Sequence, residues 1–217
     1  MAKKKALHLG DGHGPGPHSY EWISGTLRSI VGGDMDSEHI ADVAGLDMGT
    51  LGKYDLIINY MGGWTPEKAP KKALAAILSY VLNGGGMLGV HCGVVAPTKG
   101  CSEINHMFSA RFTGHPAMRD ITFKAAEGAG AHPIMEGFKP FTVFEEPYTF
   151  RMDEMGEVTL LMEFEHEGKA VPGGWVNAFG LGKVAYLVPG HDKGVFEDPG
   201  FAAVLRRAAQ WAAGIIS

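Results

Sequence analysis

The stretch that decides the fold is Gly84-Gly85-Gly86-Met87-Leu88-Gly89-Val90-His91-Cys92-Gly93. Its apolar centre, residues 87–90, is bounded by turn-forming glycines and predicts a short buried strand. Because ligands of an open parallel sheet bind beyond the carboxyl ends of its strands, this strand would deliver His91 and Cys92 to such an edge. The flanking glycines leave room for a sharp turn that resembles a nucleophile elbow, in which a reactive side chain sits between a strand and a helix. The alternative is that Cys92 is a small buried hydrophobic residue, as most free cysteines are.

Strands and helices alternate before this stretch. The segment 54–59 is nearly continuous in apolar residues, which is typical of a strand buried on both faces. Thr65-Pro66 predicts a helix start, with Thr65 as the N-cap and Pro66 at the first helical position. The other elements expected here are strands at 5–9 and 37–43 and a helix at 20–31.

The second half of the chain has a looser pattern and ends in a clear helix. Asp198-Pro199 repeats the cap-plus-proline signal, and apolar residues follow at helical spacing. The other elements expected here are a short helix at 102–108, a loop at 111–116, and strands at 120–125, 158–164, 170–176 and 183–188. The alternation along the chain predicts an α/β fold with a mainly parallel central sheet and helices on both faces.

Composition narrows the class of protein. The 217 residues suffice for one domain with a sizeable core, and no linker or repeat divides them, so we predict one domain over 1–217. A net charge of −5 makes nucleic acid and anionic membranes poor partners. No apolar run reaches membrane-spanning length and the basic start lacks a secretory apolar core, so we expect a cytoplasmic protein with no membrane partner. Its two cysteines are then expected to be reduced thiols.

Polar side chains follow four of the predicted strands. His13 and His18 lie in a Gly- and Pro-rich loop at 10–18, which does not match a dinucleotide-binding GxGxxG pattern. The other strand ends carry Asn59, the pair His91 and Cys92, and His191. If the strands are parallel, these groups gather on one rim of the sheet, where imidazoles suit proton transfer near neutral pH.

Three chemical interpretations of this rim remain open. In the first, Cys92 is a nucleophile activated by His191. In the second, the histidines and a glutamate bind a catalytic metal, although no HxH, HExxH or CxxC spacing supports it. In the third, His91, His191 and Glu146 carry out acid/base chemistry on a polyol or sugar, and either Glu145 or Glu146 orients an imidazole.

An ordered set of short elements resembles the trehalose-utilisation (ThuA-like) family. The set begins with residues 54–59, Gly62-Gly63, a helix, and the stretch 83–92. It continues with Phe112-Thr113-Gly114-His115-Pro116, Glu145-Glu146-Pro147-Tyr148 and Pro189-Gly190-His191. The resemblance covers nearly the whole chain, and the order of the elements is more specific than any one of them.

The resemblance implies a fold like that of class I glutamine amidotransferases, a flavodoxin-like three-layer α/β sandwich. It also implies a role in sugar or glycoside metabolism, around disaccharides such as trehalose and their keto derivatives. The polar positions that it carries over are His91, His115, Glu146, Tyr148 and His191. A glutaminase would have His-x-Glu near the last strand, whereas this chain has His191-Asp192-Lys193, so glutamine hydrolysis is disfavoured.

The leading prediction is an enzyme that acts on a small-molecule sugar or sugar derivative, with His91, Glu146 and His191 as acid/base groups. Predicted substrate contacts are His13, His18, Asn59, Trp64, His115 and Tyr148. No cofactor is predicted, and a divalent metal at the His/Glu rim and a homo-oligomeric state are left open. The alternatives are a hydrolase or amidotransferase-like enzyme that depends on Cys92, and a sugar-binding module without catalysis.

Overall fold

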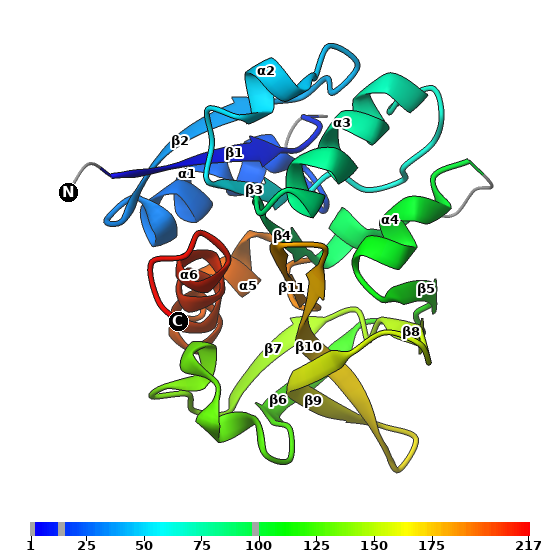
Figure 1. Ribbon diagram of the computed structural model, residues 1–217. Helices are drawn as coiled ribbons and strands as arrows, with labels where there is room; N and C mark the ends of the chain where they lie inside the picture. The colour runs from blue at the N-terminus through cyan, green and yellow to red at the C-terminus, as the bar shows by residue number, and fades with distance from the viewer. Residues whose placement is uncertain (1–2, 13–15, 97–99) are drawn as a thin grey trace.

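A nine-stranded sheet forms the centre of the computed structural model, which describes residues 3–12, 16–96 and 100–217 (Figure 1). Its strands lie in the order β2-β1-β3-β4-β11-β10-β9-β6-β7. The first five in this order pair in parallel. They are β2 (Met35–Ile40), β1 (Lys4–Leu9), β3 (Leu56–Asn59), β4 (Gly86–Val90) and β11 (Gly182–Leu187). This is the strand order of the flavodoxin-like fold, which confirms the predicted class.

The other strands of the sheet form an antiparallel wing. Each of its pairings, from β11 onward, is antiparallel. Its strands are β10 (Lys169–Phe179), β9 (Val158–His166), β6 (Arg119–Ala125) and β7 (Phe141–Glu145). A separate two-stranded sheet pairs β5 (Ala110–Gly114) with β8 (Thr149–Met152). The β9–β10 hairpin points away from the parallel strands (Figure 1), whereas the end of β7 meets the segment after β11, where the Glu145 carboxylate accepts from the Gly190 backbone N–H.

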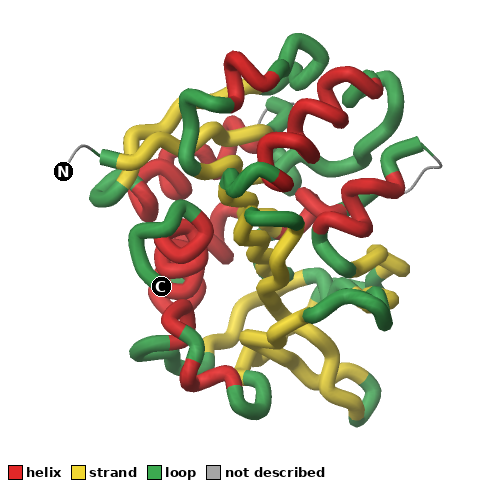
Figure 2. Tube along the Cα trace, in the orientation of Figure 1, coloured by secondary structure: helices red, strands yellow, loops and turns green. Residues whose placement is uncertain are grey.

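Helices cover both faces of the parallel strands, so the core has three layers (Figure 2). On one face α6 packs on β3, β4 and β11 and contacts α1 and α5. On the other face α3 packs against α2 and β11. The helices are α1 (Tyr20–Val31), α2 (Met48–Leu51), α3 (Lys71–Leu82), α4 (Ser102–Met107), α5 (Lys193–Glu197) and α6 (Pro199–Ala212). Within the described ranges, no helix combines the length and the apolar character needed to cross a bilayer.

The last helix forms as its sequence predicts. The Asp198 carboxylate accepts a hydrogen bond from the Phe201 backbone N–H at 2.9 Å, and Pro199 occupies the first turn. The first backbone N–H groups of a helix have no partner within the helix. Asp198 accepts a hydrogen bond from one of them, and Pro199 has no N–H that would need a partner. Phe201, Val204 and Leu205 then share the buried face of α6.

Three local predictions are wrong. The helix expected from Thr65-Pro66 begins only at Lys71, and Thr65 caps a single turn before it. Pro70 interrupts the helix because it has no backbone N–H and because the residue before a proline disfavours the helical conformation. The strand expected at 37–43 is Met35–Ile40, because its pairing with β1 sets the register from Lys4↔Met35 to Leu9↔Ile40. The loop expected at 111–116 contains β5, which pairs with a strand about forty residues later that the sequence pattern did not reveal.

Candidate functional site

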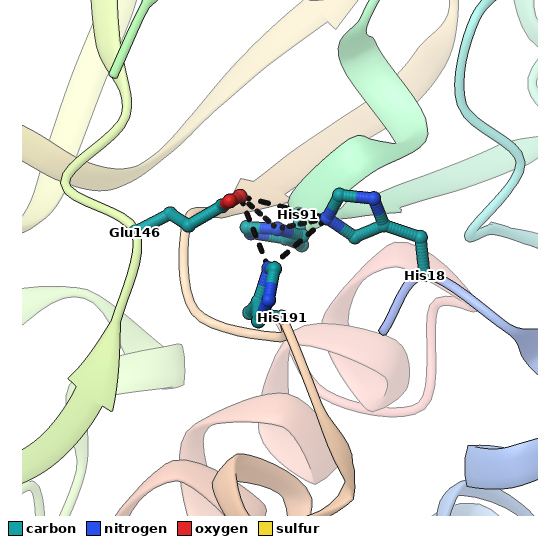
Figure 3. Close-up of side chains that lie close together, drawn as sticks. All are labelled: His18, His91, Glu146 and His191. Carbon is teal, nitrogen blue, oxygen red and sulfur yellow. Dashed lines mark hydrogen bonds and ion pairs between the residues drawn. The ribbon is translucent and has the colours of Figure 1, made fainter. Parts of the chain in front are cut away.

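Four side chains from four distant segments converge at the carboxyl edge of the parallel strands (Figure 3). His18 precedes α1, His91 follows β4, Glu146 follows β7, and His191 follows β11. The His18 Nε2 atom lies 3.0 Å from His91 Nε2 and 3.1 Å from His191 Nδ1. The Glu146 Oε2 atom lies 3.1 Å from His191 Nδ1, 3.3 Å from His91 Nε2 and 3.5 Å from His18 Nε2. We name these four residues the histidine–glutamate cluster.

The turn after β4 is a strained elbow, and its strained residue is His91. The φ of His91 is +47°, in the left-handed region that side chains other than glycine rarely adopt. Gly93 makes this turn possible, because a Cβ at that position would lie 2.1 Å from the Asn59 carbonyl oxygen. The elbow expected from the glycines is therefore present, but it presents His91 to the rim and turns Cys92 inward. The expectation that Cys92 would occupy its apex is corrected.

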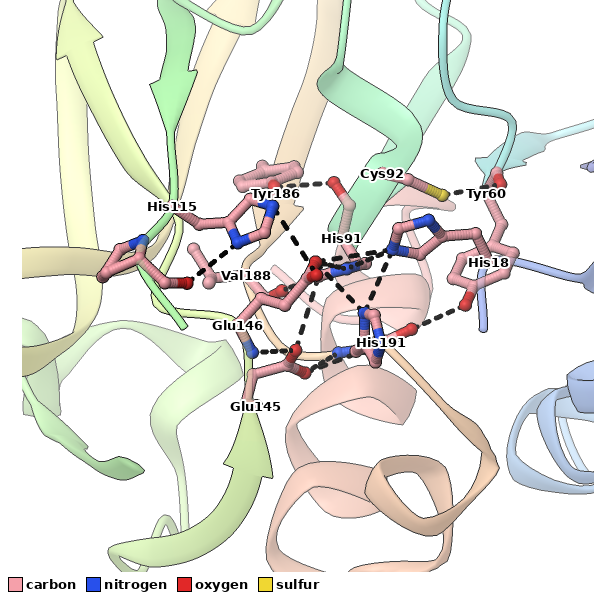
Figure 4. Close-up of polar contacts among 12 residues, drawn as sticks. His18, Tyr60, His91, Cys92, His115, Glu145, Glu146, Tyr186, Val188 and His191 are labelled. Atoms are coloured by element: carbon pink, nitrogen blue, oxygen red, sulfur yellow. Dashed lines mark hydrogen bonds and ion pairs between the residues drawn. The ribbon is translucent and has the colours of Figure 1, made fainter. Parts of the chain in front are cut away.

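Hydrogen bonds and ring contacts fix the orientation of the His91 imidazole (Figure 4). Its Nδ1–H donates to the Val188 carbonyl oxygen at 2.9 Å, so its Nε2 lone pair faces the cluster. The Tyr148 ring stacks on the imidazole with a centroid distance of 4.2 Å. The Tyr186 hydroxyl donates to the His91 carbonyl oxygen at 2.7 Å. His91 is fully buried and is held in one orientation from both sides.

Glu145 stands behind the cluster and joins two of its segments. Its carboxylate accepts hydrogen bonds from the backbone N–H groups of Glu146 at 2.7 Å, Gly190 at 2.6 Å and His191 at 3.1 Å. The side chain is completely buried. The sequence left Glu145 and Glu146 as alternatives for contact with an imidazole. The structure places Glu146 in the cluster and gives Glu145 the role of holding Glu146 and His191 in position.

Burial and mutual charge shift the titration of the cluster. Burial, together with the neighbouring His91 and His191, lowers the pKa of His18 to about 4. Burial alone would raise the pKa of Glu146, but the close imidazoles of His91, His191 and His115 lower it to about 2. Burial opposes protonation of His91, yet the charge of Glu145 and the contact with Glu146 give a net rise of its pKa. At neutral pH Glu146 is therefore ionised and His18 is neutral.

A cavity of about 340 Å³ adjoins the cluster. Its wall includes His18, which is a member of the cluster, and Tyr148, which stacks on His91. Lys68 also lines it and donates from Nζ to Asp11 at 2.7 Å and to the Gly62 carbonyl oxygen at 3.0 Å. The volume lies at the lower end of the range of small-molecule sites. A larger hollow of about 690 Å³, between α4 and the β5–β8 sheet, shares no lining residue with the cluster. Sequence reasoning missed Asp11 and Lys68, because their pairing depends on two loops that meet only in the fold.

The remaining predicted contacts occupy different places. His115 lies at the outer edge of the cluster, with its Nε2 atom 3.6 Å from Glu146 Oε1. Asn59 and Trp64 are buried behind the elbow, and both donate to the Gly93 carbonyl oxygen, at 2.5 Å and 3.1 Å. Their position supports the elbow, so we do not propose substrate contact for them. His13 lies outside the described residues.

The Cys92 thiol is buried in the wall of the 340 Å³ cavity. Its Sγ donates to the Tyr60 carbonyl oxygen at 3.1 Å, and the residue is 4% exposed. Burial, with a smaller contribution from the charge of Asp11, raises the pKa of the thiol well above its usual value. Among the described residues, no hydrogen bond joins Cys92 to His191. This environment is typical of a structural thiol and opposes the thiolate that a nucleophile needs.

Cys92 should therefore react slowly with iodoacetamide in the native protein. We expect its labelling to be at least about tenfold slower than in urea-unfolded protein at the same pH, because burial hinders access and suppresses the thiolate. Peptide mass spectrometry after timed labelling measures the rate, and Cys101, which is also buried, serves as an internal reference. Native labelling as fast as that of the unfolded chain would restore the nucleophile interpretation.

Comparisons with known proteins agree with this fold. The family model ThuA, described as trehalose utilisation, matches residues 7–212. No match was found among curated protein sequences. A putative ThuA-like protein from Parabacteroides merdae ATCC 43184 is 18% identical with a TM-score of 0.79, over 98% of this chain and 90% of that chain. The cytoplasmic protein STM1381 from Salmonella typhimurium LT2 is 14% identical with a TM-score of 0.70, over 96% and 99% of the two chains. PurLQS from Thermotoga maritima is 12% identical with a TM-score of 0.62, over 96% and 98%.

Proposed function

Because this chain belongs to the ThuA family, which is described as trehalose utilisation, we propose that it is an enzyme that transfers protons on a sugar or sugar derivative. The observation that carries the proposal is the convergence of three imidazoles and one carboxylate at the rim of a cavity. Disaccharides and their keto derivatives are the substrate class. A cytoplasmic location and a homo-oligomeric state stay predictions.

The cluster supplies the groups that such a reaction requires. A hydroxyl group, or a C–H group next to a keto oxygen, must lose a proton, and the sugar oxygen that gains charge must be stabilised. A carboxylate such as Glu146 and imidazoles such as His91 and His191 are the usual residues for these tasks. His115 lies at the open side of Glu146 and is placed to pass protons to and from solvent.

The adjoining cavity has the lining that sugar binding requires. The Lys68–Asp11 pair offers charged hydrogen-bonding groups, and Pro17, Val95 and the buried Tyr148 contribute apolar atoms to the lining. Sugars combine hydroxyl groups with apolar C–H faces, so a wall of this composition fits them. The hydrolase or amidotransferase-like alternative has less support, since Cys92 lines the same cavity but its thiol is buried and donates to the Tyr60 carbonyl oxygen.

A substrate panel tests the proposal. Purified protein is incubated with trehalose, other disaccharides and their keto derivatives, and the products are followed by NMR and mass spectrometry. We expect the wild-type protein to convert at least one member of the panel and the Glu146→Gln variant to leave it unchanged. Calorimetric binding of a sugar without conversion of any panel member would instead favour the sugar-binding module.

A further inference from the structure

We infer that the histidine–glutamate cluster is the binding site of a tetrahedral divalent transition-metal ion, with Zn²⁺ as the best fit. Binding of the ion follows from the arrangement of four ligand atoms and does not depend on any reaction. Its role in catalysis rests on the proposed function, because His18, one of the four cluster residues, lines the sugar cavity.

The spacing of the four atoms matches a metal centre. Five of the distances between His18 Nε2, His91 Nε2, His191 Nδ1 and Glu146 Oε2 are 3.0, 3.1, 3.1, 3.3 and 3.5 Å, and all four atoms lie within 4.8 Å of one another. In a regular tetrahedron with metal–ligand bonds of about 2.05 Å, typical of zinc, the ligands are about 3.3 Å apart. These five distances surround this value, and the sixth pair, His91 Nε2 and His191 Nδ1, lies within the 4.8 Å limit, so an ion would bind by drawing these two imidazoles together.

The cluster also has an excess of acceptors over donors. In its neutral form, the one that binds a metal, His91 directs the lone pair of Nε2 inward, since its Nδ1–H is used by Val188. The Glu146 side chain is only 10% exposed, and its Oε2 atom has no hydrogen bond of acceptable geometry to any described residue. The three imidazole nitrogens around Oε2 lie at ion-pair distances instead. A buried acceptor without a partner is costly, and a bound cation would satisfy it together with the three nitrogens.

The residues behind the cluster resemble the outer shell of a metal site. Metal-binding histidines usually donate their second N–H to a backbone carbonyl or a carboxylate, as His91 does toward Val188. Glu145 fixes the backbone of both Glu146 and His191 through three hydrogen bonds. Two of the ligand-bearing segments are thus held in place before any ion arrives.

The donor set selects the class of ion. Three imidazoles and one carboxylate favour zinc and neighbouring first-row ions such as Co²⁺, whereas Mg²⁺ and Ca²⁺ prefer oxygen ligands. The His18 side chain is 41% exposed and lines the cavity, so it is the ligand that a substrate oxygen could replace. In that arrangement the ion would polarise the sugar oxygen, and His115 would remain available for proton transfer.

Metal titration of chelator-treated protein tests the inference. Protein is stripped with a chelator, dialysed and titrated with Zn²⁺, and bound metal is counted by plasma mass spectrometry. Co²⁺ is added in parallel, because tetrahedral cobalt absorbs visible light strongly. We expect one equivalent of either ion in the wild type, and an affinity at least about a hundredfold lower in His191→Ala, since even changes in the outer shell cost tenfold or more. The matched control His166→Ala, in the β9–β10 hairpin outside the cluster, should keep one equivalent.

His18→Ala is a second cluster variant. Because the His18 side chain is partly exposed, its removal should disturb the fold less than removal of His191. Circular dichroism monitors the fold of each variant. Uptake of less than about a tenth of an equivalent by stripped wild-type protein, or wild-type affinity in both cluster variants, would overturn the inference.

The sugar assay separates the metal site from the proposed function. Metal uptake without any sugar conversion removes only the proposed function, and sugar conversion by protein that takes up no metal removes only the metal site.

Discussion

Replacement of Glu146 by glutamine should lower kcat on the sugar substrate by about 10²- to 10⁴-fold, the range typical of a lost acid/base group. The substitution keeps the size of the side chain and removes its negative charge. Glu146 Oε2 lies within 3.5 Å of His18, His91 and His191, so the charge acts on all three imidazoles at once. An amide neither accepts a proton at neutral pH nor binds a cation as strongly as a carboxylate. The loss is therefore expected whether the cluster works directly or through a metal ion.

Steady-state kinetics of the wild type and the Glu146→Gln variant measure this effect at several pH values. Glu165→Gln, an exposed position on β9, is the matched control and should keep wild-type kcat. Circular dichroism at the assay temperature checks that both variants are folded. A Glu146→Gln kcat within threefold of the wild-type value would exclude the cluster as the reaction centre.

Replacement of Glu145 by alanine should lower the free energy of unfolding by about 3 kcal/mol or more, since each buried donor left without a partner costs about 1–3 kcal/mol. Three backbone N–H groups, those of Glu146, Gly190 and His191, would lose their acceptor. The carboxylate also joins β7 to the loop after β11, which lies about 45 residues further along the chain. Its loss should therefore loosen Glu146 and His191 as well as the fold.

Urea denaturation measures the effect of Glu145→Ala through the midpoint of unfolding. Glu145→Gln keeps one carbonyl acceptor and should be destabilised less. Glu165→Ala is the matched surface control and should stay within about 0.5 kcal/mol of the wild type. If Glu145→Ala is as stable as Glu165→Ala, water must replace the carboxylate at the three N–H groups, and the positioning role of Glu145 is refuted.

Most of the parallel half of the sheet could be predicted because its signals are local. The apolar segments that became β1, β3 and β4 and the capped helix α6 are each specified by neighbouring residues. The antiparallel strands, in the wing and in the separate β5–β8 sheet, were predicted less completely. Strands β5, β7 and β8 are short and half-exposed, and they are stabilised by pairing with distant strands rather than by their own pattern.

The sequence by itself determined which residues reach the carboxyl edge of the sheet, since strand ends and the turns after them are encoded locally. It therefore placed His18, His91 and His191 among the candidates, whereas Glu146 entered as a carboxylate partner for an imidazole and through the family resemblance. Only the tertiary structure decided which member of each adjacent pair faces the site. The His91 imidazole enters the cluster while the Cys92 thiol points to the Tyr60 carbonyl oxygen, and Glu146 enters the cluster while Glu145 supports it from behind. The physical reason is that neighbouring residues at a turn point in different directions, and their partners come from segments far away in the chain.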